Sequence, residues 1–282
     1  MELRELGVKE IVFTGGEVFA RNDALSIIRM AREMFFDVII FSNISLLNKE
    51  KVNELASLYI NAISCTIFSL NPEIHDSIVR KKGALQIVLE NLKLLKDNNI
   101  NIIIKTPLLK INKDETKKIE EFCKYNEYLY KVDAQIIPVR NSIDNQYNSE
   151  LCLSFKELID IQEDIDRING AVPKTRRGCG YSICSSQKIS LYIAADGSIY
   201  PCSLFPLSLG NAYSQSIKNI KDLNKKKALE NIEVRNMDKC GTCALSDYCV
   251  ICPGLSYMES SNYLNCSSLS RKTAIARKEI YG

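Results

Sequence analysis

Residues 240–254 read CGTCALSDYCVICPG and hold four of the eleven cysteines of this 282-residue chain. Cysteines separated by two residues let one tight turn direct two thiolates at the same metal centre. Four more cysteines lie in the same C-terminal part of the chain: Cys179, Cys184, Cys202 and Cys266. Together these eight thiols predict a metal–thiolate domain with two four-thiolate sites.

The kind of metal follows from the donor set. Zinc ribbons usually place two C-x-x-C pairs about 15 residues apart and use four ligands. Here eight thiols share one region, and the chain contains a single histidine. This pattern favours iron–sulfur clusters. A zinc-stabilised interaction domain remains the alternative prediction.

Composition excludes several classes of protein. A hydrophobic content of 46% and a charged content of 25% are those of a soluble globular protein. The net charge of +3 is too small to indicate a nucleic-acid-binding face, and no apolar run approaches the ~18 residues of a membrane helix. The charged N-terminus, MELRELGVKE, is no secretory signal. We therefore predict a cytoplasmic protein with reduced thiols, in which Cys65, Cys123 and Cys152 are small hydrophobic residues.

Upstream of the cysteines, short apolar runs alternate with amphipathic stretches. The predicted strands are residues 10–14, 37–42, 62–68, 101–105 and 132–139. Six helices are predicted between and after these strands. The first follows Asn22, the second spans residues 48–59, the third starts at Pro72 and the fourth spans residues 84–99. The fifth follows an Asn112–Glu115 cap, and the sixth runs from a Ser154–Glu157 cap to Asn169. This alternation predicts a parallel α/β sheet. A polar stretch at residues 170–178 sets the domain boundary, giving domains 1–170 and 171–282.

Ligands collect at the carboxyl ends of parallel strands, so the candidate site residues are sought there. They are Gly15-Gly16-Glu17, Ser42-Asn43, Ser64, Thr66, Lys105 and Arg140. Other interpretations stay open: a glycine pair can be only a turn, strand-end hydroxyls can face water, and Arg140 can form a surface ion pair. The single histidine, His75, begins a capped helix, where a structural role is the commoner one.

The cysteine spacing resembles a SPASM domain. Cys184, Gly197 and Cys202 are separated by twelve and four residues, and the pairs of residues 240–252 and then Cys266 follow. The family usually leaves three residues between the last two cysteines of the quartet, where this chain has only Val250 and Ile251. The resemblance implies two auxiliary [4Fe–4S] clusters. It implies that Cys179, Cys184, Cys202 and Cys252 hold the first, and that Cys240, Cys243, Cys249 and Cys266 hold the second.

Gly15-Gly16-Glu17 after the first strand resembles the GGE motif of radical S-adenosylmethionine (AdoMet) enzymes, although Val18 stands where proline is usual. The resemblance implies that Gly15, Gly16, Glu17, Ser42 and Thr66 bind AdoMet. It further implies that the fold is a partial (β/α)6 barrel. The implied activity is that of a cytosolic oxidoreductase and peptide maturase, which abstracts hydrogen from a peptide or protein through a 5′-deoxyadenosyl radical. A flavodoxin- or ferredoxin-like protein is the implied electron donor. Non-catalytic peptide binding or electron transfer is the alternative.

This family also carries C-x-x-x-C-x-x-C after its first strand, holding a third [4Fe–4S] cluster. The printed sequence has no such motif, since its first cysteine is Cys65. Residues 1–6 resemble the end of the helix that follows that loop, with Gly7 as terminator. The resemblance therefore implies a fragment that lacks the first strand, a split-gene half whose partner is a separate N-terminal fragment, or a degenerate relative. We expect the chain alone not to cleave AdoMet.

Overall fold

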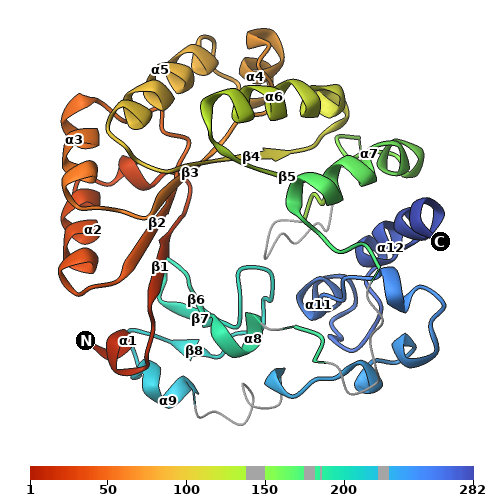
Figure 1. Cartoon of the computed structure of the whole chain (residues 1–282). Helices are drawn as coiled ribbons and strands as arrows, with labels where there is room; N and C mark the ends of the chain where they lie inside the picture. Colours follow the sequence, from red (N-terminus) through yellow and green to blue (C-terminus); the bar gives the residue numbers. More distant parts are fainter. Residues whose placement is uncertain (138–149, 175–181, 185, 222–228) are drawn as a thin grey trace. The chain divides into compact units, whose positions relative to one another are not determined.

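The computed structural model describes residues 1–137, 150–174, 182–184, 186–221 and 229–282 (Figure 1). Its contacts divide the chain into two compact units. The sheet unit contains Gly7–Ile136, and the cysteine-rich unit combines Met1–Leu6 with Ser154–Gly282. This division differs from the predicted boundary near residue 170. Helix α7 (Phe155–Asn169) belongs to the cysteine-rich unit because it packs against α12 (Ser268–Tyr281).

The sheet unit is built on five parallel strands in the order β1-β2-β3-β4-β5. The strands are β1 (Glu10–Phe13), β2 (Asp37–Phe41), β3 (Ala62–Thr66), β4 (Ile102–Pro107) and β5 (Leu129–Asp133). The predicted parallel α/β architecture is therefore confirmed. The fifth strand starts three residues earlier than predicted and ends at Asp133, because its register pairs Leu129 with Ile103 of β4.

Helices α2, α3, α5 and α6 lie along one face of this sheet (Figure 1). The helical segments of the unit are η1 (Val18–Ala20), α2 (Ala24–Glu33), α3 (Lys49–Ser57), α4 (Pro72–Val79), α5 (Ala84–Asp97), η2 (Lys110–Glu115) and α6 (Thr116–Asn126). Fully buried aliphatic side chains such as Val38, Ile40 and Ile104 form the core on that face. On the opposite face, alternate residues such as Ile39, Phe41 and Lys105 are only half-buried.

The predicted helix caps have mixed outcomes. Ser154 and Glu157 form the expected reciprocal cap, since the Ser154 amide donates to Glu157 Oε2 at 2.9 Å and the Glu157 amide donates to Ser154 Oγ at 3.3 Å. The Asn22 cap is wrong, because Asp23 holds the N-cap position of α2. The Asn112–Glu115 cap is also wrong: both residues are buried and bind a loop that follows β3.

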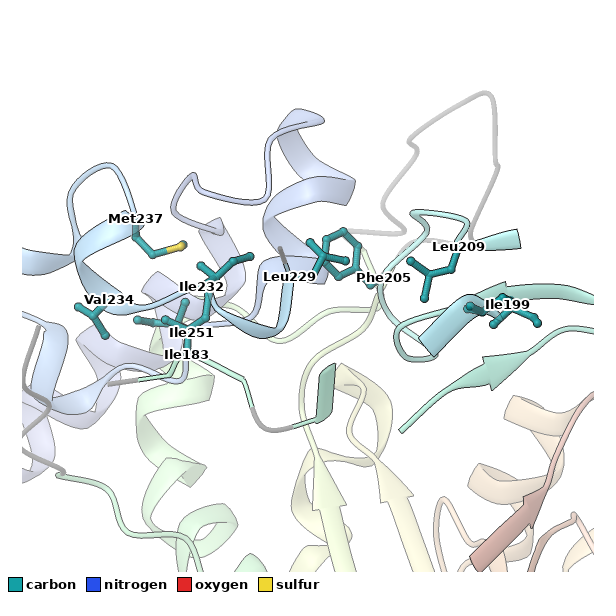
Figure 2. Packing of buried hydrophobic residues seen from close by; sticks show 10 residues of the cluster. Ile183, Ile199, Phe205, Leu209, Leu229, Ile232, Val234, Met237 and Ile251 are labelled. Carbon is teal, nitrogen blue, oxygen red and sulfur yellow. The ribbon is translucent and has the colours of Figure 1, made fainter. Parts of the chain in front are cut away.

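The cysteine-rich unit consists of short elements around its own apolar core. They are α1 (Glu2–Glu5), α7, α8 (Ser186–Ile189), β6 (Tyr192–Ile193), β7 (Ser198–Tyr200), β8 (Gly210–Asn211), α9 (Ile217–Lys221), η3 (Val234–Asn236), η4 (Cys240–Thr242), η5 (Ser246–Tyr248), α11 (Pro253–Ser260) and α12. Figure 2 shows Ile183, Ile232 and Ile251 side by side in that core. Half-buried Cys184, Cys202, Cys240 and Cys249 pack against it.

The N-terminal segment behaves as the sequence predicts. Residues 2–5 form α1, and Gly7 adopts a φ of 77°, which suits a helix terminator. Within the cysteine-rich unit, Glu2 accepts a hydrogen bond of 2.8 Å from the amide of Ile217, and Glu5 pairs with Lys218. Among the described helices, none combines the length and the apolar character needed to span a membrane.

Candidate functional site

Glu17 is the centre of the hydrogen-bonded site at the carboxyl ends of β1 and β2. Gly15 has a φ of 155°, a backbone region that is open essentially to glycine alone. The turn that follows places Glu17 so that its Oε1 accepts hydrogen bonds from the Ser42 hydroxyl at 2.7 Å and the Phe19 amide at 3.0 Å. Its Oε2 accepts a bond of 2.8 Å from the amide of Asn43. The structure thus brings Glu17 and Ser42 together.

Thr66, the fifth candidate AdoMet ligand, is the last residue of β3 and is half-buried. The loop after it is held by side chains from several elements. His75 of α4 accepts a hydrogen bond of 3.3 Å at Nδ1 from the Phe68 amide, Thr106 donates to the Ile67 carbonyl at 2.8 Å, and Asn112 donates to the Phe68 carbonyl at 2.8 Å. This network fixes the end of β3.

His75 has the structural role that the sequence favours. It is buried, and burial lowers the pKa of its imidazole. A neutral ring is needed, because Nδ1 accepts the Phe68 N–H. Its position in α4 follows from Asn71, whose side chain caps the helix by accepting from the Glu73 amide at 2.9 Å.

Cys252 is the centre of a first thiol group in the cysteine-rich unit. Burial, and after it the thiols of Cys202 and Cys184, raise the pKa of Cys252. The turn after Cys202 reaches the start of α11 because residue 254 is glycine: a Cβ there would lie 2.9 Å from the carbonyl oxygen of Leu204. The remaining predicted member of this set, Cys179, lies outside the described residues.

A second thiol group surrounds Cys240. Burial, followed by the thiols of Cys266 and Cys243, raises the pKa of Cys240. A tight turn joins Cys240 and Cys243, whose amide donates to the Cys240 carbonyl at 3.3 Å. The backbone bond of 3.1 Å between Asp238 and Leu264 brings the Cys266 segment to that turn. Cys249 contacts α12 through a 3.9 Å bond to the Ser270 carbonyl.

The chemistry of these donors fits a thiolate-bound metal centre. The ten cysteines of the described chain are thiols, not disulfides. Burial and neighbouring thiols disfavour the ionised forms of Cys240 and Cys252, and the positive charge of a metal would reverse that effect. Among the described residues, no three His, Cys, Asp or Glu side chains lie close enough to hold one metal ion. The two groups therefore bring thiols together without reaching ligand geometry.

Sequence reasoning missed some contributors to these sites. The Phe19 amide binds Glu17 through its backbone, so no side-chain signal could reveal it. Phe41 lies beneath the Lys105 ammonium, and only the alternation of β2 together with its sheet register could have indicated this contact. Arg140, a predicted candidate, lies outside the described residues.

Comparison with known families and proteins agrees with the fold and the motifs. Residues 1–123 match the radical SAM superfamily, and residues 184–244 match SPASM, an iron–sulfur cluster-binding domain. The chain is 27% identical over 232 residues to the antilisterial bacteriocin subtilosin biosynthesis protein AlbA of Bacillus subtilis strain 168, covering 76% of this chain and 49% of AlbA. It is 25% identical over 223 residues to the sporulation killing factor maturation protein SkfB of the same strain, covering 76% of this chain and 53% of SkfB. The chain thus spans about half the length of these two relatives.

Solved structures share the fold over most of the chain. The structure of native anSMEcpe with bound AdoMet and Kp18Cys peptide matches 96% of this chain and 82% of its own, with a TM-score of 0.70 and 15% identity. Streptococcus suis SuiB bound to S-adenosylmethionine matches 96% of this chain and 68% of its own, with a TM-score of 0.71 and 17% identity. The chain thus combines a region that matches the radical SAM superfamily, residues 1–123, with a region that matches the SPASM iron–sulfur cluster-binding domain, residues 184–244.

Proposed function

We propose that this chain forms the AdoMet-binding sheet and the auxiliary-cluster domain of a peptide-modifying radical SAM enzyme. The observation that carries the proposal is the gathering of thiols into two groups, Cys184–Cys202–Cys252 and Cys240–Cys243–Cys266. These groups agree with the division of eight cysteines between two [4Fe–4S] clusters that the SPASM resemblance implies. Cys179 would complete the first set, and Cys249 the second.

The sheet unit has the groups that a zwitterionic methionine moiety needs. Glu17 carries a negative charge that suits the amino group of AdoMet, and its hydrogen bonds to Ser42 and Asn43 hold the carboxylate still. The Gly15-Gly16 turn leaves backbone groups uncovered, since a Cβ on either residue would meet no atom within 4 Å. Together with the third, reduced [4Fe–4S] cluster, whose C-x-x-x-C-x-x-C motif the printed sequence does not contain, bound AdoMet would supply hydrogen-atom abstraction.

A peptide or protein is the substrate class that the relatives support. AlbA and SkfB are by name a bacteriocin biosynthesis protein and a maturation protein, and SuiB has been solved bound to the precursor peptide SuiA. We extend this to the present chain as part of the proposal. It also includes a cytoplasmic location, where thiols stay reduced, and a flavodoxin- or ferredoxin-like donor, because reductive cleavage of AdoMet consumes an electron.

The experiment is metal and sulfide analysis of anaerobically reconstituted protein. We expect about eight irons and about eight sulfides per chain. Replacing Cys202 by serine should remove about four irons and leave the second cluster, since one cluster loses a ligand. The matched control is Cys152→Ser, which changes a half-buried cysteine outside both groups and should keep all the iron. Stoichiometric zinc with negligible sulfide would contradict the proposal and favour a zinc-stabilised domain.

A further inference from the structure

Three polar or charged residues share the half-buried face of the sheet, opposite the helices. In the parallel register, Ser64 pairs with Phe41 on one side and with Ile103 on the other, while Thr66 pairs with Lys105. Paired residues of adjacent strands point to the same face, and so do residues two apart on one strand. Phe41, Ser64, Thr66 and Lys105 therefore all project from this face.

Lys105 reaches across β3 on this face. Its Nζ lies 3.3 Å from the centre of the Phe41 ring, although Lys105 belongs to β4 and Phe41 to β2. Because β3 lies between those strands, the lysine side chain passes the part of β3 that carries Ser64 and Thr66. Its ammonium group ends at the level of Phe41 and Ser64, nearer the amino ends of the strands than Ser42 and Thr66.

This ammonium group is incompletely compensated. Lys105 is half-buried, and among the described residues no carboxylate pairs with it; the Phe41 ring is its cation partner. A ring face attracts a cation by about 0.5–2 kcal/mol, which is less than a buried carboxylate provides. Burial also lowers the pKa of Lys105. A carboxylate would therefore stabilise the charged form of Lys105 more strongly than the Phe41 ring does.

Ser64 gives an independent sign of an unfilled polar contact. The residue is only 3% exposed, and its hydroxyl is buried without a hydrogen-bond partner in the described chain. Buried hydroxyl groups are normally hydrogen-bonded, because an unpaired one costs about 1–3 kcal/mol. A hydroxyl donor and an ammonium group at the same level of one face are together suited to the two oxygens of a carboxylate.

We propose that Lys105 and Ser64 form a subsite for a carboxylate of the substrate, either an acidic side chain or a peptide C-terminus. The inference rests on the proposed peptide-modifying function and names a recognition element of the same site. The candidate AdoMet residues Glu17 and Ser42 follow the last residues of β1 and β2, and Thr66 ends β3. Ser64 lies two residues before that end, one layer further in. A cofactor at the strand ends leaves that inner layer to the second ligand.

The test compares two synthetic tripeptides, acetyl-Ala-Glu-Ala-amide and acetyl-Ala-Gln-Ala-amide, by equilibrium dialysis against reconstituted protein with saturating AdoMet. We expect the wild-type chain to bind the glutamate peptide about tenfold more tightly than its glutamine counterpart. Lys105→Met should abolish this preference, and Lys105→Arg should keep part of it. No preference in the wild-type chain would overturn the proposal.

The control variant is Lys131→Met. Lys131 pairs with Lys105 in the register and projects from the same face of β5, but it is exposed. If general positive charge attracts the glutamate peptide, Lys131→Met will reduce the preference as much as Lys105→Met does, and the subsite is then wrong. Retention of the preference in Lys131→Met supports the assignment to Lys105.

A second arm identifies the source of the carboxylate. The same proteins are dialysed against AdoMet and decarboxylated AdoMet in the absence of peptide. We expect Lys105→Met to leave the ratio of the two affinities unchanged. If the variant loses the advantage of AdoMet, Lys105 holds the cofactor's carboxylate and the substrate assignment is overturned. Iron and sulfide content of each variant reports separately on the proposed function.

Discussion

The sheet unit and the cysteine-rich unit prepare their candidate sites in different ways. In the sheet unit, Glu17 is held by three hydrogen bonds that the chain itself supplies. In the cysteine-rich unit, burial and then neighbouring thiols raise the pKa of Cys240 and the pKa of Cys252. A site at strand ends is thus stabilised by the fold alone, whereas gathered thiols require a metal's charge before they stabilise anything. The following predictions test this contrast, from the largest effect to the smallest.

The largest effect is expected from removing one cluster ligand. Cys243→Ala should abolish or strongly lower the thermal transition of the cysteine-rich unit, because metal-binding free energy contributes directly to its folding. Cys123→Ala, in the buried face of α6, should cost the sheet unit only about 1–2 kcal/mol, as a small cavity does. Calorimetry of reconstituted protein measures both. Equal shifts for the two variants would argue against cluster ligation by Cys243.

A buried ion pair provides the next largest effect. Arg277 of α12 donates to Asp166 of α7, with Nε at 2.9 Å from Oδ2, and Gln162 donates to the same carboxylate at 3.0 Å. Arg277→Met should lower the free energy of unfolding by about 3–5 kcal/mol, because a buried carboxylate loses its partner. Denaturant unfolding should show this loss in the cysteine-rich unit and not in the sheet unit. The double variant with Asp166→Leu should recover most of it; failure to recover would point to lost packing instead.

The stability of the sheet unit should depend on pH through His75, the single histidine of the chain. Burial lowers the pKa of His75 below its ordinary value of 6.5. The unfolded chain therefore binds the proton first, and the stability of the sheet unit should fall as the pH drops below 6.5. His75→Leu should flatten this dependence and cost about 1–3 kcal/mol at neutral pH, since the buried Phe68 amide loses its acceptor. Unfolding measured from pH 7.5 to about pH 5 checks both outcomes; an unchanged slope in the variant would be contrary to the prediction.

The smallest effect is expected at the turn between β6 and β7. Gly197 has a φ of 79°, and a Cβ there would lie 2.5 Å from the Tyr213 ring. Gly197→Ala should destabilise the cysteine-rich unit by about 1–2 kcal/mol through the unfavourable left-handed backbone. The exposed Tyr213 ring can move aside, so the steric part is small. Gly241→Ala is the control, because nothing lies within 4 Å of its Cβ. Equal unfolding free energies for these two variants would contradict the argument.

Local sequence patterns determined much of this protein. Apolar runs ended by glycine or polar residues gave the first four parallel strands nearly to their ends, and the Ser154–Glu157 spacing gave a real helix cap. The cysteine spacing and Gly15-Gly16-Glu17 indicated the families that the comparisons found. These features depend on a few neighbouring residues, so the sequence carries them directly.

Tertiary structure alone decided which distant residues meet. The family resemblance implied that Cys202 and Cys252 share a site, but it could not show that their approach depends on the glycine at residue 254 against Leu204. It could not limit the last strand to Leu129–Asp133, since pairing with β4 sets those bounds. Nor could it place the Lys105 ammonium over Phe41, two strands away. The physical reason is common to all three: register and close backbone approach are set by contacts between segments far apart in the chain, which no local propensity encodes.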